Sequence, residues 1–379
     1  MCGEAFGIHQ VTGSYPTEKA MHWSLEKILR GARSMAATDV HLSQGVAPIL
    51  RINGELKPAQ GPALEKEDLQ AIHDSLLEAK QKEAFARDWQ LSFSRTLAGI
   101  GRFRVSVYLH AGTPEFAIRL CETVVRTAED LGLPAVVAEF TRLTGGLILV
   151  TGPTGMGKTT TLNYMVHTIN EERRAKIITL EDPVEYVHSN IRSLVIQQEL
   201  LCDFQSFNGA LRAVLRQDPD VIVIGEMRDL DTIETALMAA ETGHLVIATL
   251  HTPDAAQTLQ RIASVFPQQQ QESIASQLAG SLQGIVSQRL LPRATGSARV
   301  LAAEVCVANT AVRNMIREGN VHQLRNEIMT GRKHKMQLMD NVLLELYQRG
   351  EITYDVAVSN CHDPDFIRQR TQRATEGRP

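Results

Sequence analysis

A glycine-rich segment, GPTGMGKTT, contains residue types suited to binding a polyphosphate group. It matches G-x-x-x-x-G-K-[ST] at every fixed position and lies between an apolar strand-like run and a helix-like run. Its glycines let backbone N–H groups curl around phosphate oxygens, and the helix N-terminus adds partial positive charge. Lys158 is predicted to reach the β- and γ-phosphates, and Thr159 to give a hydroxyl to Mg²⁺. The predicted nucleotide-binding residues are Gly152, Pro153, Thr154, Gly155, Met156, Gly157, Lys158, Thr159 and Thr160.

A carboxylate is expected beside this loop, because Glu226 follows a second apolar run, Val221 to Ile224. Open parallel sheets bind ligands at the carboxyl ends of their strands, where phosphate-loop proteins keep their metal and water chemistry. Glu226 is therefore predicted to act as general base or to orient the attacking water, and to contact Mg²⁺. Asp218 and Asp220, ahead of the strand, are interpreted as structural.

Three further acids, Glu181, Asp182 and Glu185, follow the apolar run Ile177 to Leu180. They also stand at a strand's carboxyl end. Glu181 is predicted to position the attacking water through Mg²⁺, with Glu185 as a weaker candidate. A solvated acidic turn is the alternative interpretation.

Two histidines bracket the run between His244 and His251. An extended strand of seven residues separates them by roughly 23 Å, on opposite faces, so they cannot share one metal ion. His251, at the carboxyl end, is predicted to contact the γ-phosphate. His244 is expected to have a structural or inter-subunit role, or none beyond a strand end.

The scaffold that must position these residues is a run of short apolar strands alternating with helices after Gly145. Strands that are apolar on both faces predict an α/β fold with a parallel sheet covered on both sides. From about Pro253 to about Gln369 the chain is expected to be mostly helical.

The front of the chain differs, because helix-like segments surround a hairpin signal at Asn53-Gly54 and an alternating strand, Arg102 to His110. Phe103, Val105, Val107 and Leu109 are expected on the buried face of that strand. The predicted division is an arm at 1–22, an α+β domain at 23–125, a linker at 126–140, an α/β domain with a helical C-terminal part at 141–369, and a tail at 370–379.

Composition excludes several classes of protein. The 379 residues are 43% hydrophobic and 22% charged, which is typical of a globular protein, and a net charge of -4 gives no basic field for nucleic acid. Five cysteines without a CxxC pair indicate neither a disulfide framework nor a paired-cysteine zinc site, and favour a reducing cytosol. We expect neither a membrane span nor a secretory leader.

The four segments occur in the order given above and are followed by SQRLLPR, Ser287 to Arg293. In this the chain resembles the motor ATPases of type II secretion and type IV pili, from about Trp23 to about Tyr354. Its opening ATDVHLSQG (Ala37 to Gly45) and its segment AVRNMIREG (Ala311 to Gly319) are similar to the retraction branch. From this resemblance we expect neither the additional N-terminal region nor the tetracysteine zinc site of the extension ATPases. Thr310 is expected to cap the AVRNMIREG helix and Gly319 to end it.

The resemblance implies a PAS-like front domain and a RecA-like motor domain, assembled as a homohexamer that binds ATP and Mg²⁺. It implies that Arg102, Arg104 and Arg119 approach the phosphates as the ring closes. Arginine stabilises charge on a transferring phosphoryl group, and Arg102 and Arg104 share the polar face of a predicted strand. A solvated strand face is the alternative, and Arg119 rests on the resemblance alone.

The implied activity is ATP hydrolysis that powers pilus retraction through the inner-membrane platform protein, at the cytoplasmic face of the inner membrane. A paralogous retraction ATPase is a further candidate partner. The chain departs from the family pattern in three places: Gln197–Leu201 reads QQELL where QREVG is usual, Ser92 replaces an aspartate, and Lys335 replaces a glycine. A nucleotide-binding accessory subunit with little turnover alone, or an extension or secretion motor, therefore stay open as alternatives.

Overall fold

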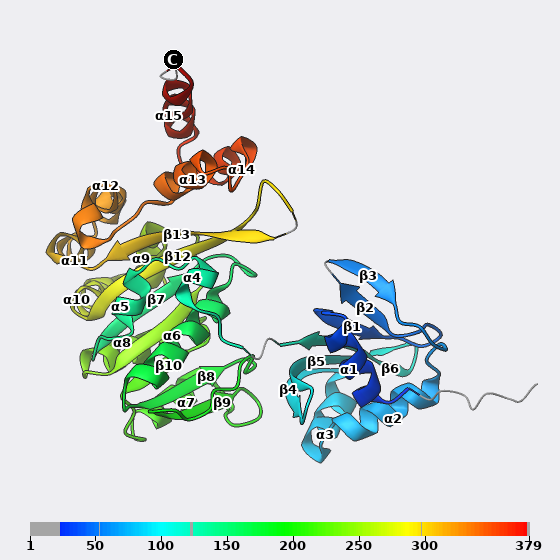
Figure 1. Cartoon of the computed structure of the whole chain (residues 1–379). Coiled ribbons are helices and arrows are strands. Elements are labelled where there is room, and N and C mark those ends of the chain that lie inside the picture. Colours follow the sequence, from blue (N-terminus) through cyan, green and yellow to red (C-terminus); the bar gives the residue numbers. More distant parts are fainter. Residues whose placement is uncertain (1–22, 53, 122–123, 297, 377–379) are drawn as a thin grey trace, which may run out of the picture. The chain divides into compact units, whose positions relative to one another are not determined.

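The computed structural model describes residues 23–376 apart from 53, 122–123 and 297, and it forms two compact units with the boundary after Cys121 (Figure 1). The predicted arm, 1–22, lies outside the described residues. The segment predicted as a linker, 126–140, belongs to the second unit. There it forms α4 (Ala128–Leu131) and α5 (Val136–Phe140), and Phe140 is buried in that unit's core.

The first unit is an antiparallel six-stranded sheet in the order β3-β2-β1-β6-β5-β4. The predicted hairpin joins β2 to β3 through Gly54, whose φ of +87° suits a glycine. The elements are α1 (Leu25–Ser34), β1 (Asp39–Leu42), β2 (Ile49–Ile52), β3 (Glu55–Pro58), α2 (Lys66–Leu76), α3 (Ala79–Asp88), β4 (Gln90–Leu97), β5 (Gly101–His110) and β6 (Thr113–Leu120).

One face of this sheet packs against the helices, and the other is polar. Phe103, Val105 and Val107 of β5 are buried with side chains from all three helices, as their alternation predicts. Leu109, expected on the same face, is 43% exposed and lies next to the last residue of β5. Arg104, between the buried positions, lies on the opposite, polar face.

The second unit is built on a seven-stranded sheet in the order β13-β12-β7-β11-β10-β8-β9. Neighbouring strands are parallel except for β12 and β13, which are antiparallel. The strands are β7 (Gly146–Thr151), β8 (Lys176–Glu181), β9 (Leu194–Glu199), β10 (Val221–Ile224), β11 (Leu245–Leu250), β12 (Leu282–Pro292) and β13 (Arg299–Val307).

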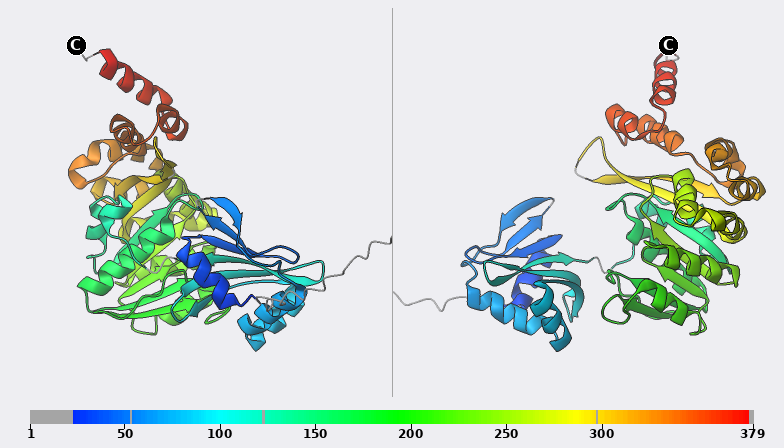
Figure 2. Two further views of the ribbon diagram at one scale, coloured as in Figure 1. Left: turned by 45° about the vertical axis from the view of Figure 1, so that its right-hand side comes forward. Right: turned by 180° about the vertical axis from the view of Figure 1, so that it is seen from behind.

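Helices lie on both faces of this sheet, so β7, β10 and β11 are buried throughout (Figures 1 and 2). One apolar core forms with α5 and α6, and a second with α7 to α12. The helices are α6 (Lys158–Glu172), α7 (Phe207–Val214), α8 (Leu230–Glu241), α9 (Ala255–Ser264), η1 (Gln268–Gln270), α10 (Gln271–Ser281), α11 (Thr310–Arg317), η2 (Val321–Gln323), α12 (Leu324–Thr330), η3 (Gly331–His334), α13 (Met339–Gln348), α14 (Tyr354–Asn360) and α15 (Pro364–Glu376).

The region after Pro253 is mostly helical, as expected, but it also contains two long strands that the sequence analysis did not predict, β12 and β13. Their apolar residues are buried in the cores of the second unit, partly against α13, a tertiary environment that favours extended chain. The helix α11 is capped by Asn309 rather than Thr310: its side chain accepts the N–H of Val312 at 2.9 Å. The predicted tail boundary at 369/370 falls inside α15.

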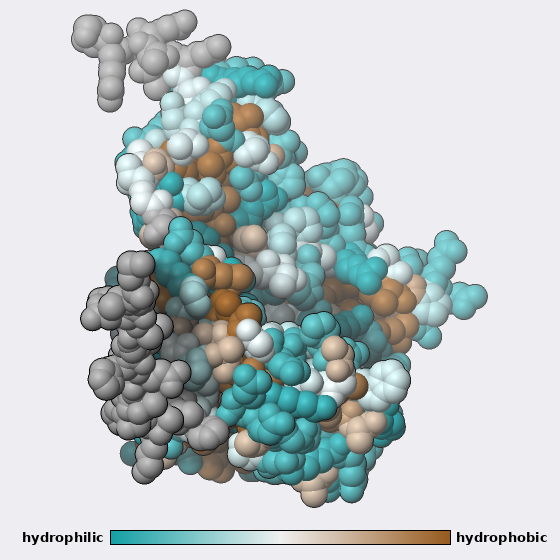
Figure 3. All heavy atoms as spheres, turned by 90° about the vertical axis from the view of Figure 1, so that its right-hand side faces the viewer, coloured by the Kyte–Doolittle hydropathy of each residue, from teal (hydrophilic) through white to brown (hydrophobic). Residues whose placement is uncertain are grey.

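None of the helices that the structure describes is long and apolar enough to cross a membrane. The face in Figure 3 is mostly hydrophilic, with its apolar residues in separate patches.

Candidate active site

The glycine-rich loop connects β7 to α6 at the carboxyl edge of the seven-stranded sheet. Its last glycine, Gly157, has φ +84° and directly precedes the helix, so backbone N–H groups at the start of α6 face the loop. Gly152 has φ +140°, and a Cβ there would come within 2.4 Å of the carbonyl oxygen of Gln288 on β12. Only a glycine lets the loop pass this close to the neighbouring strand. The predicted strand-loop-helix arrangement is therefore present.

Lys158 is the centre of the contacts inside the loop. Its side chain is buried, and Nζ donates hydrogen bonds to the carbonyls of Gly152 at 2.7 Å and Pro153 at 3.0 Å. It also lies 3.3 Å from Nδ1 of His251, which Thr154 Oγ1 approaches at 3.4 Å. Burial lowers the pKa of Lys158, and the charge of the nearby Glu226 opposes that shift.

His251 connects the loop to Glu226. Because the lysine donates to Nδ1, the ring proton is on Nε2, which donates to Glu226 Oε1 at 2.8 Å. The three side chains come from α6, the end of β11 and the end of β10. The structure thus brings Glu226 toward the loop, with His251 between the lysine and the carboxylate.

Arg228 is the residue that sequence reasoning missed here. Its Nε donates to Glu226 Oε2 at 2.8 Å, and its Nη1 lies 3.6 Å from Asp182 Oδ2. The hydrogen bond to Glu226 raises the pKa of the guanidinium. The basic residue two positions after Glu226 was the available sequence signal, but a two-residue spacing in a loop does not determine contact.

Glu181 ends β8, next to β10 in the sheet, and the N–H of Gly225 donates to the carbonyl of Leu180 at 2.8 Å. This register brings Glu181 and Glu226 to neighbouring strand ends. Glu181 is buried, and its Oε1 accepts from Thr179 Oγ1 at 2.6 Å and from Gln197 Nε2 at 3.0 Å.

The donors at this edge fit a magnesium ion. Thr159 at the start of α6, Glu181 and Glu226 offer hydroxyl and carboxylate oxygens, the ligand class that Mg²⁺ prefers. Within the part of the chain that the structure describes, no group of three or more His, Cys, Asp or Glu side chains could hold a metal ion by itself. Mg²⁺ sites typically use one or two carboxylates together with substrate phosphates and water.

The remaining sequence candidates are one histidine of the second unit and three arginines of the first unit. His244 is at the opposite end of β11, where Nδ1 lies 3.0 Å from the Ala239 carbonyl oxygen. Arg102, Arg104 and Arg119 belong to the first unit. Arg104 and Arg119 are direct cross-strand partners, and Arg119 Nε donates to Asp39 Oδ1 at 2.9 Å.

The strand β12 supports the loop from the side, which the sequence did not predict. Thr151 donates to Ser287 at 2.8 Å, and the N–H of Leu290 donates to the sulfur of Met156 at 3.2 Å. Arg299, at the start of β13, reaches the carbonyl of Gly155 at 3.3 Å.

Two of the three departures from the family pattern occupy left-handed backbone. Leu201 has φ +64° and Lys335 φ +61°, which explains why glycine suits both positions. Lys335 forms an ion pair with Glu139 of α5. The third departure, Ser92, donates to Ser106 Oγ at 3.2 Å.

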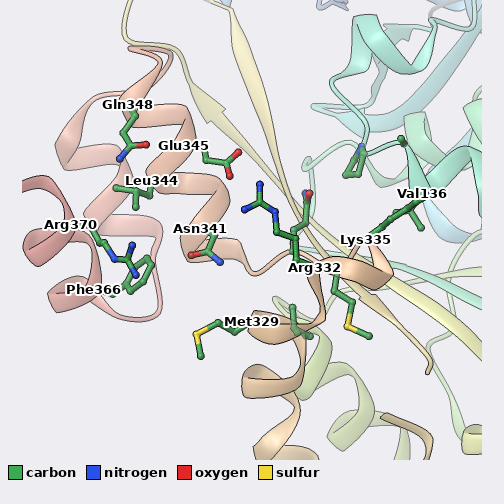
Figure 4. A pocket seen from close by; sticks show the side chains of 15 residues that line it. Val136, Met329, Arg332, Lys335, Asn341, Leu344, Glu345, Gln348, Phe366 and Arg370 are labelled. Atoms are coloured by element: carbon green, nitrogen blue, oxygen red, sulfur yellow. The ribbon is translucent and has the colours of Figure 1, made fainter. Parts of the chain in front are cut away.

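Lys335 also lines a hollow of about 940 Å³ between α5, η3, α13 and α15 (Figure 4). Arg332, Glu345 and Arg370 are among its other lining residues. None of the predicted site residues lines it.

Comparison with known proteins places the chain in a family. The model of the family "Type II/IV secretion system protein" matches residues 102–379. The type IV pilus retraction ATPase PilT of Pseudomonas aeruginosa is 39% identical over 341 residues, 90% of this chain and 99% of that protein. A twitching motility protein of Neisseria gonorrhoeae is 40% identical over 310 residues, 82% of this chain and 83% of that protein.

Comparison with solved structures gives the same family relationship. A crystal structure of the pilus retraction motor PilT with bound ADP superposes with a TM-score of 0.86 and 42% identity, covering 92% of this chain and 99% of that one. The Legionella pneumophila ATPase DotB gives a TM-score of 0.74 at 25% identity, covering 90% and 96%. The fold is thus an N-terminal domain followed by a RecA-like ATPase domain, as the sequence predicted. The chain therefore belongs to the type II/IV secretion ATPase family and, within it, groups with the pilus retraction ATPases.

Proposed function

We propose that this chain hydrolyses ATP as a homohexameric motor that powers type IV pilus retraction. The observation that carries the proposal is the side-chain bridge from Lys158 through His251 to Glu226, which joins a phosphate-binding lysine to a carboxylate on a neighbouring strand. In a phosphate-loop ATPase these two groups serve opposite ends of the reaction, the triphosphate and the attacking water.

The residues have distinct proposed roles. The amides of the loop from Gly152 to Thr160 bind the phosphates, and Lys158 exchanges its carbonyl contacts for β- and γ-phosphate oxygens. Thr159, Glu181 and Glu226 would hold Mg²⁺, which supplies charge neutralisation on the phosphates when bound.

Glu226 activates the attacking water, either as general base or as the group that orients it. Its bond to His251 Nε2–H at 2.8 Å keeps the carboxylate turned toward the loop. His251 is then close enough to Lys158 to contact the γ-phosphate, the role proposed for it from sequence.

Arg102, Arg104 and Arg119 would supply positive charge to the transferring phosphoryl group from the first unit of the same or an adjacent subunit. Their common polar sheet face supports this role, because Arg104 and Arg119 are cross-strand partners there. The motion of the first unit would be passed to the inner-membrane platform protein of the pilus, at the cytoplasmic face of the inner membrane.

Replacing Glu226 with glutamine tests the proposal. Glu226→Gln keeps the shape of the side chain and removes its basicity, so turnover of MgATP should fall by about 10² to 10⁴ while nucleotide affinity stays within about threefold. Glu241→Gln is the control, because it removes an exposed carboxylate from the last residue of α8, ahead of the start of β11. Unchanged turnover in Glu226→Gln, or an equal loss in both variants, would defeat the assignment.

The second candidate is a nucleotide-binding accessory subunit that needs a paralogous retraction ATPase for turnover. Gln198, where a basic residue is usual, and Leu201, 75% exposed in a left-handed conformation, favour it. ATPase activity measured together with particle mass decides between the two. A motor has activity alone at about six times the 41.9-kDa chain mass, whereas an accessory subunit has none until the second ATPase is added. Restoration of twitching in a retraction-deficient strain excludes an extension or secretion motor.

A further inference from the structure

Two asparagines on α6 hold the connection between β8 and β9. Asn163 and Asn170 are seven residues apart, two helical turns, and therefore share one face of the helix. Both are buried. Asn170 donates to the carbonyl of Ser189 at 2.7 Å and accepts the N–H groups of Ile191 at 3.1 Å and Ser193 at 3.2 Å. Its contacts are with backbone only, which is a structural role.

Asn163 makes a different set of contacts, one of which reaches the phosphate loop. Its Nδ2 donates to the carbonyl of Thr159 at 2.8 Å, and its Oδ1 accepts from Nε2 of His188 at 2.7 Å. The amide orientation requires the histidine proton to be on Nε2. Burial lowers the pKa of His188 to about 4, with a smaller contribution from His167, so the ring is neutral at pH 7 and Nε2 carries its single proton.

The chain of hydrogen bonds continues from His188 to the acidic segment. The backbone N–H of His188 donates to Gln197 Oε1 at 2.8 Å. Gln197 Nε2 then donates to Glu181 Oε1 at 3.0 Å and to the carbonyl of Tyr186 at 2.7 Å. The side chain of His188 on one side and its backbone N–H on the other therefore connect the first turn of α6 to the carboxylate at the end of β8.

We propose that Asn163, His188 and Gln197 are positioning residues that fix the separation between Thr159 and Glu181, and so tune the affinity of the site for Mg²⁺. This inference rests on the metal roles proposed above for Thr159 and Glu181. Residues behind metal ligands orient them, and their loss typically costs 10- to 100-fold in metal affinity.

Packing alone does not account for these side chains. A buried amide in a helix interior is costly unless both of its polar atoms are bonded, and leucine at the same position would form a more stable helix. Asn170 meets this condition through backbone groups alone. Asn163 meets it in part through the side chain of His188, whose backbone N–H donates to the Gln197 side chain that contacts Glu181. The two asparagines therefore form a natural pair for comparison, since only one lies between the two ligand residues.

Binding of a fluorescent ATP analogue to the full chain tests the proposal without relying on turnover. Affinity is measured first in EDTA and then as MgCl₂ is added, which gives the Mg²⁺ concentration at half-effect. His188→Leu and Asn163→Leu should raise that concentration about tenfold and leave the affinity in EDTA within about twofold. His188→Gln should stay within about threefold of the parent protein, because its Nε2–H can donate to Asn163. Asn170→Leu should lower the melting temperature without changing the Mg²⁺ midpoint.

The outcomes separate this inference from the proposed function. Thr159→Ala and Glu181→Gln are the reference variants: if they shift the Mg²⁺ midpoint and His188→Leu does not, the positioning role is wrong and the metal assignment stands. If neither reference variant shifts it, both fail. An equal shift in Asn170→Leu would also overturn the positioning role. Should Asn163→Leu not fold, the comparison of His188→Leu with His188→Gln decides.

Discussion

Replacing Gly152 with alanine probes how tightly the phosphate loop is fitted against the sheet. The added Cβ would lie 2.4 Å from the carbonyl oxygen of Gln288 and 3.3 Å from its carbonyl carbon. These are backbone atoms of β12, which pairs with β13 at Ala303, and the Gln288 side chain is bonded to Thr161 at 2.7 Å. The strand cannot move aside cheaply, so the loop must shift.

Two costs add in this variant. A non-glycine residue at φ +140° costs about 1–3 kcal/mol, and overpacking against a fixed strand costs about 1–3 kcal/mol. Together these costs amount to about 2–6 kcal/mol, which lowers the melting temperature of a unit of this size by about 4 °C or more. Displacing the loop amides should also weaken nucleotide binding by about tenfold or more.

Gly155→Ala is the matched control in the same loop. Gly155 has φ +78°, but no atom lies within 4 Å of the position its Cβ would take, so only the conformational cost of about 1–2 kcal/mol remains. We expect a decrease of about 2–4 °C. Because Trp23 and Trp89 are both in the first unit, tryptophan fluorescence does not report on this transition, and scanning calorimetry is the appropriate assay. Equal melting temperatures for the two variants would refute the steric reasoning.

Three further predictions concern other parts of the second unit. Burial lowers the pKa of His188 from 6.5 to about 4. The free energy of unfolding should therefore be constant above pH 6.5 and fall by about 3 kcal/mol in all as the pH decreases toward 4. Calorimetry should find a weaker pH dependence in His188→Gln. The buried Asp340 carboxylate accepts hydrogen bonds from the N–H groups of His362 and Asp363 and forms an ion pair with Arg325. Asp340→Ala should therefore destabilise the C-terminal helices by about 3–5 kcal/mol. The measurement is hydrogen exchange, which should become faster in α13 to α15 than in β7. Chelation of Mg²⁺ should abolish ATP turnover, and restored MgCl₂ should recover it.

Much of the site could be predicted from sequence, because its parts are continuous segments. The loop from Gly152 to Thr160 carries its own strand, turn and helix start, and the apolar run before Glu226 is long enough to identify a buried strand end. The position of Glu181 and Glu226 at the same edge of the sheet followed from the rule that the carboxyl ends of parallel strands lie together. The helix at Ala311 was also predicted, with its cap misplaced by one residue.

What the sequence could not give were contacts that depend on strand order and on side-chain direction. Nothing in the spacing of Lys158, His251 and Glu226 states that β11 lies between β7 and β10, yet that order is what brings His251 between the other two. Arg228, Gln197 and His188 were overlooked for the same reason.

The local chemistry of the chain thus determined which segments form strands, which turn binds phosphate and which residue types stand at the strand ends. Tertiary structure decided that β12 and β13 are strands at all, since their apolar residues suit either conformation until β7 pairs with β12 and β12 pairs with β13. It also decided which polar side chains meet. A backbone turn is specified by neighbouring residues, whereas a hydrogen bond between distant strands exists only once the sheet has fixed their order and register.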